Sequence, residues 1–313
     1  MKKTEIKAFA KINLSLDVKA LLDNGFHQVE MIMQQISLCD RVLVRWYEDL
    51  SKAPSHVEVE LSTSKFFLPT DRRNLAYKAA LLMYEVSGKR PKGKVRIDIK
   101  KNIPVAAGLA GGSSDGAAVI HALNLLWELR LPLEELCSIG ARLGSDVPFC
   151  VMGQARGNPF LKKVFHGDPL ASSCALAAGT GTDMTPLPPL KAPLVLSKPP
   201  VSVSTAEVYR GIDHVEIPIR PDNEELIHGL SKNNLKIIEK NMINVLENFT
   251  LKSYPNVMYT KNKMQDLCSP HRVLMSGSGP TVFGICDTAA DAKRVRDIMR
   301  EVNRESFWSE TIL

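Results

Sequence analysis

The stretch Pro104-Val105-Ala106-Ala107-Gly108-Leu109-Ala110-Gly111-Gly112-Ser113-Ser114 decides the fold. It follows a segment with period-two hydrophobicity at 94–100 and precedes an Ala-rich segment with helical spacing. Glycine lets backbone N–H groups approach an anion closely, and the N-terminus of a helix adds favourable partial positive charge. The stretch therefore predicts a phosphate-binding loop between a strand and a helix. A tight connection without a ligand is the alternative, because a glycine-rich loop alone is weak evidence.

The patterns on either side of this loop indicate a mixed fold. A long alternating segment covers 6–18, a turn is expected at Asp23-Asn24-Gly25, and further strand patterns lie at 42–46, 57–61 and 95–99. Helical spacing covers 75–87, 133–144, 223–230, 234–248, 255–268 and 289–303, and a strand–loop–strand pattern covers 272–286. Strands gathered around a few helices without strict βαβ alternation predict an α+β fold.

Composition restricts the class of protein. The chain has 313 residues, of which 44% are hydrophobic and 24% are charged, as in ordinary globular proteins that fold as two domains. No apolar run approaches the ~20 residues needed to span a bilayer. The strand pattern begins almost at Met1, so we expect no targeting peptide and a cytoplasmic protein that does not bind membranes.

The charged and metal-binding side chains are dispersed. The net charge is +6, but the basic residues are scattered among acidic ones, which disfavours nucleic-acid binding and fits attraction of small anions such as nucleotides. None of the six cysteines forms a Cys-x-x-Cys pair, so reduced thiols are expected. The seven histidines are spread along the chain, and no metal cluster is visible.

Three separated motifs resemble those of the GHMP kinases, the superfamily of galactokinase, homoserine kinase and mevalonate kinase. They are Ala10-Lys11-Ile12-Asn13-Leu14, the segment 104–117, and Met275-Ser-Gly-Ser-Gly-Pro-Thr-Val-Phe-Gly284. The motifs occur in the family's order, and the resemblance runs through most of the chain. It implies an ATP-dependent small-molecule kinase, with Mg²⁺ as the accompanying ion.

The resemblance also implies a two-domain GHMP kinase fold. We expect a GHMP kinase N-terminal domain at 1–153, similar to the second domain of ribosomal protein S5, that carries the phosphate loop and the catalytic residues. A ferredoxin-like C-terminal domain is expected at 201–313, after a linker region at 174–200. Residues 154–173 match nothing in the family, and we expect them to be an insertion that forms a surface excursion.

Within the family, the resemblance is greatest to the branch whose substrate is a cytidine diphosphate-linked polyol in the non-mevalonate isoprenoid precursor pathway. It rests on Gly25-Phe26-His27, on the Gly-Gly-Ser-Ser at 111–114 and on Gly144-Ser145-Asp146-Val147-Pro148-Phe149. A monomer or weak dimer is expected. One alternative is a GHMP kinase for a smaller alcohol, such as homoserine or mevalonate. Another is a non-catalytic nucleotide-binding relative, although such a protein has no need of a catalytic pair.

The resemblance assigns Lys11 and Asp146 as the catalytic pair. Phosphoryl transfer needs an acceptor for the hydroxyl proton, which Asp146 supplies, and Lys11 keeps that carboxylate ionised and orients the hydroxyl. Without the resemblance, Lys11 is interpreted as a solvated strand lysine and Asp146 as an ordinary helix N-cap.

Other site residues follow from the same resemblance. Asn74 and Leu75 match positions near the adenine, although Asn74 could equally cap a helix. Asn13, Phe26, His27 and Tyr209 match substrate-side positions, and Phe26 with Tyr209 could sandwich the cytosine. Plain core packing is the alternative for the two aromatic residues. Ser114 is a candidate Mg²⁺ ligand. Phe26 stands where relatives usually have Tyr, so a phenolic hydrogen bond is lost.

Overall fold

The chain folds into two compact units, each assembled from three separate segments. The computed structural model describes residues 1–23, 25–48, 57–88, 92–268 and 272–313. Unit 1 comprises Met1–Ala10, Cys39–Ile103 and Ala110–Ala171, and unit 2 comprises Lys11–Leu38, Pro104–Leu109 and Ser172–Leu313. This division differs from the sequence-based boundaries at 153 and 201, because the N-terminal segments contribute to both units.

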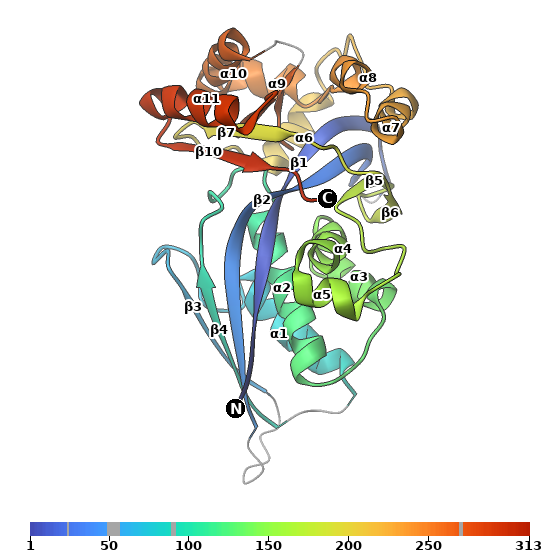
Figure 1. Cartoon of the computed structure of the whole chain (residues 1–313), viewed down its shortest axis with the longest axis vertical. Coiled ribbons are helices and arrows are strands. Elements are labelled where there is room, and N and C mark those ends of the chain that lie inside the picture. Colours follow the sequence, from blue (N-terminus) through green and yellow to red (C-terminus); the bar gives the residue numbers. More distant parts are fainter. Residues whose placement is uncertain (24, 49–56, 89–91, 269–271) are drawn as a thin grey trace. The chain divides into compact units, whose positions relative to one another are not determined.

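Two long strands supply part of each unit (Figure 1). They are β1 (Lys2–Leu21) and β2 (His27–Glu48). In unit 1, the later part of β2 pairs antiparallel with β4 (Gly93–Lys100), and β4 pairs parallel with β3 (Glu58–Thr63). Val42, Val44 and Trp46 alternate with more exposed residues, so β2 has one face in the core, as its period-two pattern predicts.

Helices complete unit 1. They are α1 (Leu75–Val86), α2 (Gly111–Leu126), α3 (Leu133–Ala141), α4 (Val147–Gly157) and α5 (Pro159–Val164). Helix α2 carries small or apolar side chains on nearly every side, and most of its residues are buried, as expected of a central helix. It contacts both α1 and α4. The phosphate loop therefore leads into a largely buried helix of the unit.

Unit 2 contains the earlier part of β2 and a separate four-stranded sheet. Residues Met31 to Gln34 of β2 pair antiparallel with β5 (Cys174–Ala178), which pairs with β6 (Asp183–Pro186). The four-stranded sheet is antiparallel, with the order β10-β7-β9-β8. Its strands are β7 (Pro193–Lys198), β8 (Val273–Met275), β9 (Val282–Ile285) and β10 (Glu305–Glu310).

The helices of unit 2 lie after β7. They are α6 (Thr205–Ile212), α7 (Asn223–Ser231), α8 (Leu235–Asn241), α9 (Glu247–Ser253), α10 (Pro255–Leu267) and α11 (Ala289–Val302). Helices α10 and α11 pack on the four-stranded sheet (Figure 1). The single helix expected at 234–248 is instead α8 and the start of α9. They are separated at Asn244, whose amide nitrogen donates to Met275 O and Gly277 O at 2.8 Å each.

The other expected elements agree with the structure, and the α+β class is confirmed. The turn expected at 23–25 includes Asn24, which lies outside the described residues. Its neighbour Gly25 has a φ of +80° and donates its N–H to Leu22 O at 2.9 Å, as a turn requires.

The expectation that 154–173 forms a surface excursion is wrong. Helix α4 continues to Gly157, with Gln154 buried inside it, and Leu161 and Phe165 pack into the core of unit 1. The side chain of Asn158 accepts from Lys7 N at 2.9 Å and donates to Lys7 O at 3.1 Å, which joins the segment to β1. Pro159 occupies the first turn of α5, where proline is tolerated, so it starts a helix rather than preventing one.

The expectation that 174–200 is a linker is also wrong. These residues form β5, β6 and β7, and β7 lies inside the four-stranded sheet between β10 and β9. The Pro and Gly residues of the segment lie between these short strands, at their ends or just after β7, so composition alone resembled that of a linker.

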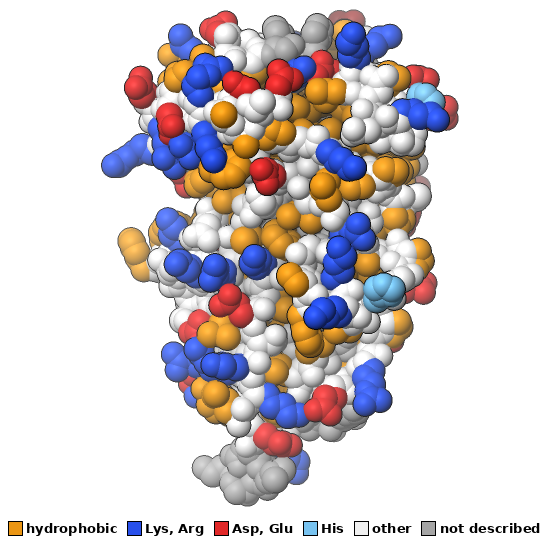
Figure 2. Space-filling model, viewed as in Figure 1, with side chains coloured by type: hydrophobic (Ala, Val, Ile, Leu, Met, Phe, Trp, Pro, Cys, Tyr) orange, Lys and Arg blue, Asp and Glu red, His pale blue; other side chains and the backbone are white. Residues whose placement is uncertain are grey.

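The charged side chains are dispersed on the surface, as their positions in the sequence predict. Figure 2 shows Lys and Arg side chains in separate groups over the visible face, with Asp and Glu between several of them. Within the described part of the chain, none of the helices combines the length and the apolar character required to cross a bilayer.

Candidate active site

Parts of all three family motifs contact one another inside unit 2. Lys11 N donates to Leu109 O at 3.1 Å, which pairs the first motif with the first half of the loop. Ser276 Oγ donates to Gly108 O at 3.0 Å, which adds the third motif. Segments far apart in the sequence therefore surround one short backbone stretch.

The approach at Gly108 is close enough to require glycine. Its φ is +72°, and a Cβ placed there would lie 2.3 Å from Ser276 O. On the other side, the Asn244 side chain holds the carbonyls of Met275 and Gly277. Backbone and side-chain hydrogen bonds thus fix the first half of the loop. Nothing in the sequence around Asn244 indicated this role, because its partners follow about 30 residues later in the chain.

Lys11 is buried, with only 4% of its surface exposed. Its Nζ donates to Asn13 Oδ1 at 2.7 Å, and Asn13 Nδ2 lies 3.3 Å from Met31 Sδ. A Cβ on Gly277 would lie 3.5 Å from the same Nζ. The interpretation of Lys11 as a solvated strand lysine is therefore excluded. A buried ammonium needs polar or anionic partners, as expected of a functional group.

The expected substrate-side residues form a second group in unit 2. The rings of His27 and Tyr209 lie 5.2 Å apart at 45°. His27 Nε2 lies 2.8 Å from Asp213 Oδ1, at the end of α6. Phe26 is 64% exposed, so plain core packing does not explain it. The sequence did not indicate Asp213, because an isolated acidic residue after a helix is common.

The second half of the loop begins α2 in unit 1. Ala110 precedes the helix with a φ of +55° and provides no side-chain cap. The first N–H groups of a helix have no partners within it, and they attract anions. In the described structure, the geometry of residues 111–113 therefore agrees with a phosphate site at this end of α2.

Ser114 does not fit the expected role of Mg²⁺ ligand. Its hydroxyl is fully buried, donates to Phe9 O at 2.7 Å and accepts from Gln154 Nε2 at 3.0 Å. A magnesium ligand needs an accessible oxygen lone pair. The described residues also contain no group of three or more His, Cys, Asp or Glu side chains suited to a metal ion.

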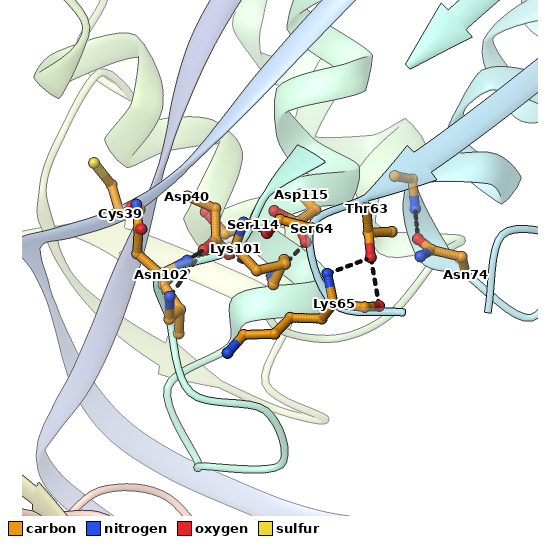
Figure 3. Close-up of polar contacts among 12 residues, drawn as sticks. Cys39, Asp40, Thr63, Ser64, Lys65, Asn74, Lys101, Asn102, Ser114 and Asp115 are labelled. Carbon is orange, nitrogen blue, oxygen red and sulfur yellow. Dashed lines mark hydrogen bonds and ion pairs between the residues drawn. The ribbon is translucent and has the colours of Figure 1, made fainter. Parts of the chain in front are cut away.

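Asn74 caps a helix. Its Oδ1 accepts from Ala76 N at 2.9 Å at the start of α1, and its Nδ2 donates to Pro69 O at 2.9 Å (Figure 3). Leu75 lies against α2, because a Cβ on Gly112 would be 3.8 Å from Leu75 Cδ1. The capping interpretation of Asn74 is thus confirmed, and its position near the adenine stays a prediction.

Asp146 precedes α4 and is half-buried in unit 1. Among the described residues, its carboxylate caps none of the free N–H groups of that helix. Asp146 therefore occupies the N-cap position, as the alternative interpretation expects, but without a side-chain capping hydrogen bond. Lys11 belongs to unit 2, so the pairing of Lys11 with Asp146 stays a proposal.

A buried charge cluster beside the loop was missed by the sequence reasoning. Lys101 Nζ contacts both Asp40 Oδ2 and Asp115 Oδ2, and Figure 3 shows the three side chains pointing toward one another. Burial raises the pKa of Asp115 to about 7, an effect that Lys101 opposes and Asp40 reinforces. Burial alone would lower the pKa of Lys101, but the two carboxylates raise it. The sequence did offer one signal for this cluster: Asp115 is a charged residue among the small residues at the start of the helix that follows the loop.

Comparisons with known families match both halves of the chain. Residues 74–154 match the GHMP kinases N terminal domain, and residues 223–305 match the GHMP kinases C terminal domain. A 4-diphosphocytidyl-2-C-methyl-D-erythritol kinase of Clostridium botulinum is 40% identical over 309 residues, which cover 98% of this chain and all of the relative. The enzyme of that name from Geobacillus kaustophilus is 43% identical over 296 residues, 94% of this chain and 92% of the relative.

Solved structures agree with these relatives. A crystal structure of 4-(cytidine 5'-diphospho)-2C-methyl-D-erythritol kinase has a TM-score of 0.76 and 30% identity, and it covers 99% of this chain and 100% of its own. Homoserine kinase from Cytophaga hutchinsonii has a TM-score of 0.70 at 18% identity, covering 100% of this chain and 96% of its own. The second similarity concerns the fold alone.

Proposed function

This chain belongs to the GHMP kinase family and is an ATP-dependent kinase, and we propose that its substrate is 4-diphosphocytidyl-2-C-methyl-D-erythritol, phosphorylated on the 2-hydroxyl. One observation carries the proposal: relatives about 40% identical over nearly the whole chain bear this name. The meeting of Lys11, Leu109, Gly108 and Ser276 supports it from the structure.

We propose that Asp146 accepts the hydroxyl proton and that Lys11 assists it. Phosphoryl transfer needs little covalent chemistry from the protein, but the hydroxyl must be positioned and its proton removed. A buried lysine held by Asn13 has a fixed position from which to orient a hydroxyl and to stabilise a nearby carboxylate. The half-buried carboxylate of Asp146, directly before α4, suits the base.

We propose that the loop 104–114 binds the phosphates of ATP, with Asn74 and Leu75 near the adenine. The backbone at 108–109 is fixed by Lys11 and Ser276, and the N–H groups at the start of α2 attract anions. When bound, Mg²⁺ neutralises phosphate charge. Because the Ser114 hydroxyl is already engaged, this residue is not proposed to hold the ion.

We propose that Phe26, His27 and Tyr209 bind the cytosine and that Asn13 lies on the substrate side. Every base offers a π-face on which an aromatic ring can stack, and Phe26 is 64% exposed. Tyr209 and His27 already contact each other, and Asp213 holds the imidazole. These contacts give the base a pre-organised aromatic site.

The two alternatives are disfavoured. Homoserine and mevalonate kinases share the fold, but at 18% and 12% identity their similarity carries no substrate assignment. The non-catalytic alternative does not agree with close relatives that are named as kinases.

An ADP-release assay tests the proposal. The purified chain is given ATP, Mg²⁺ and one alcohol at a time: 4-diphosphocytidyl-2-C-methyl-D-erythritol, homoserine or mevalonate. We expect turnover with the first only, and near-complete loss of turnover in Asp146→Asn with ATP affinity retained, since the amide cannot accept the proton. Equal turnover with homoserine or mevalonate would refute the substrate, and an active Asp146→Asn variant would refute the base.

A further inference from the structure

Both ends of the phosphate loop are attached to one buried charge cluster. The loop leaves unit 1 after Ile103 and re-enters it at Ala110. Lys101 lies just before the first point and Asp115 just after the second, and Asp40 of β2 lies beside them (Figure 3). The exposed fractions are 0% for Asp40, 8% for Lys101 and 4% for Asp115, so water does not screen their interactions.

Asp40 holds the first end of the loop. Its Oδ1 accepts from the backbone N–H groups of Asn102 at 2.5 Å and Ile103 at 2.8 Å, and its Oδ2 accepts from Lys101 Nζ. Asn102 Nδ2 donates to Cys39 O at 2.8 Å, which adds a contact to β2. The last residues before the loop are thus attached to the sheet by side-chain and backbone hydrogen bonds.

Lys101 connects this end to the other one. Its Nζ also donates to Asp115 Oδ2 at 2.6 Å, in the second turn of α2. A Cβ on Gly111 would lie 3.5 Å from Lys101 Nζ and 3.1 Å from Ile103 Cγ2. The start of α2 therefore rests directly on Lys101 and Ile103.

Direct phosphate binding by Lys101 does not fit these contacts. An ammonium has three donors, and two of those of Lys101 are directed at buried carboxylates. A purely stabilising role is equally unsuited, because buried ion pairs contribute little net stability. The described structure also gives the buried Asp115 Oδ1 no hydrogen-bond partner, which a stabilising cluster would avoid.

We propose that Asp40, Lys101 and Asp115 are positioning residues that hold the two ends of the phosphate loop at the spacing that ATP binding requires. The inference rests on the proposed function, in which the loop 104–114 binds the phosphates of ATP. The residues act through the loop backbone and do not touch the nucleotide.

The test separates ATP affinity from stability. Asp115→Asn keeps the shape of the side chain but removes one charge that holds Lys101. Asp98→Asn is the matched control, because Asp98 pairs with Arg45 in the same sheet and contacts neither end of the loop.

Calorimetric titration measures the dissociation constants of ATP and of the cytidine substrate, and thermal unfolding gives Tm. In Asp115→Asn we expect the ATP constant to rise by about tenfold or more, equivalent to about 1.4 kcal/mol, with the cytidine constant unchanged. The control should change neither constant.

Unchanged ATP affinity in folded Asp115→Asn overturns the inference, and so does a parallel loss of affinity for both ligands with a lower Tm. Asp40→Asn is the second variant and should show the same selective loss. If neither variant folds, the cluster is required for folding rather than for ATP binding, and the inference is wrong. Wild-type protein is titrated first. No ATP binding there would refute the proposed function itself, whereas normal wild-type binding with unaffected variants would refute only this inference.

Discussion

At the scale of single residues, the three glycines of the phosphate loop differ in the space that surrounds them. Gly108 needs its positive φ and has no room for a Cβ beside Ser276 O. Gly111 lies against Ile103 and Lys101. Gly112 has room, since the nearest atom to its added Cβ is Leu75 Cδ1 at 3.8 Å. Substitution at Gly112 therefore tests ligand approach without a strong effect on packing.

We expect Gly112→Val to weaken ATP binding and to leave the fold intact, because the added methyl groups obstruct phosphates rather than protein atoms. Gly108→Ala is the comparison, and its clash should lower the free energy of unfolding by about 1–3 kcal/mol. Calorimetric titration and urea unfolding measure the two effects. Wild-type ATP affinity in Gly112→Val would show that no phosphate approaches this residue.

Tyr209→Ala should weaken binding of the cytidine substrate by about 1–3 kcal/mol, the usual range for losing a base–aromatic stack. The loss includes the support that Tyr209 gives to the His27 ring. Tyr259→Ala is the control, because Tyr259 is an exposed tyrosine of α10. Titration with each ligand measures the effect. An equal loss for ATP would favour core packing as the role of Tyr209.

The sequence could nominate candidate site residues only where they belong to contiguous motifs. Lys11, Gly108 and Asp146 could be named because each lies in a recognisable local pattern. Asp40, Asn244 and Asp213 could not, since their partners lie far away in the chain: Asp40 and Lys101 are 61 residues apart, and His27 and Asp213 are 186 apart. Only folding gives these polar residues their partners.

At the scale of secondary-structure elements, strong periodicity was predictive and short helices were not. The strand pattern at 6–18 lies inside β1, and α11 ends one residue before the expected 303, whereas the pattern at 42–46 covers only the later part of β2. Helix α5 has six residues, between Gly157 and Phe165, and its sequence is typical of a loop. It forms because Leu161 and Phe165 pack into the core, an effect that local propensity does not contain.

Helix α2 carries a buried histidine that makes stability depend on pH. His121 is fully buried, its Nε2 lies 2.9 Å from Val151 O, and its ring meets Phe165 at 5.6 Å. Burial lowers the pKa of His121 to about 4, although the Val151 hydrogen bond opposes the shift. Its ordinary pKa is 6.5, so between these values the unfolded chain binds the proton more strongly and the folded state loses stability.

We therefore expect the free energy of unfolding to fall as the pH drops from about 6.5 to about 4, with up to about 3 kcal/mol due to His121. Urea unfolding across this range measures it. His121→Gln should be less stable at pH 7 but should lack this share of the slope. Identical slopes in the two proteins would assign the acid sensitivity to other groups.

At the scale of the whole molecule, the two units are interleaved along the chain, so neither unit is one continuous segment. The chain passes from one unit to the other at residues 10/11, 38/39, 103/104, 109/110 and 171/172. Sequence reasoning expected consecutive domains, because motifs mark short segments and not the path of the chain between them. Strands β1 and β2 each contribute to both units, and no local pattern marks where they change.

This path predicts that unit 1 cannot be isolated by truncation. A fragment of residues 1–171 contains all of unit 1, but it also carries 11–38 and 104–109, whose unit is otherwise missing. Strand β2 would lose its partner β5, and Leu16 would lose its backbone bonds to Ile243 and Val245. Buried side chains such as Ile12, Leu14 and Ile32 would become exposed.

Unpaired strand edges and exposed apolar residues cause association, so we expect the fragment to aggregate or to lack a cooperative thermal transition. The full chain under the same conditions should elute from size-exclusion chromatography without aggregates and unfold cooperatively. Circular dichroism and size-exclusion chromatography compare the two. A monomeric fragment with a cooperative transition would contradict this prediction. It would mean that the apolar side chains of 11–38 can be buried without residues 172–313. It would also mean that the stability of unit 1 does not depend on unit 2, although β1 and β2 run through both.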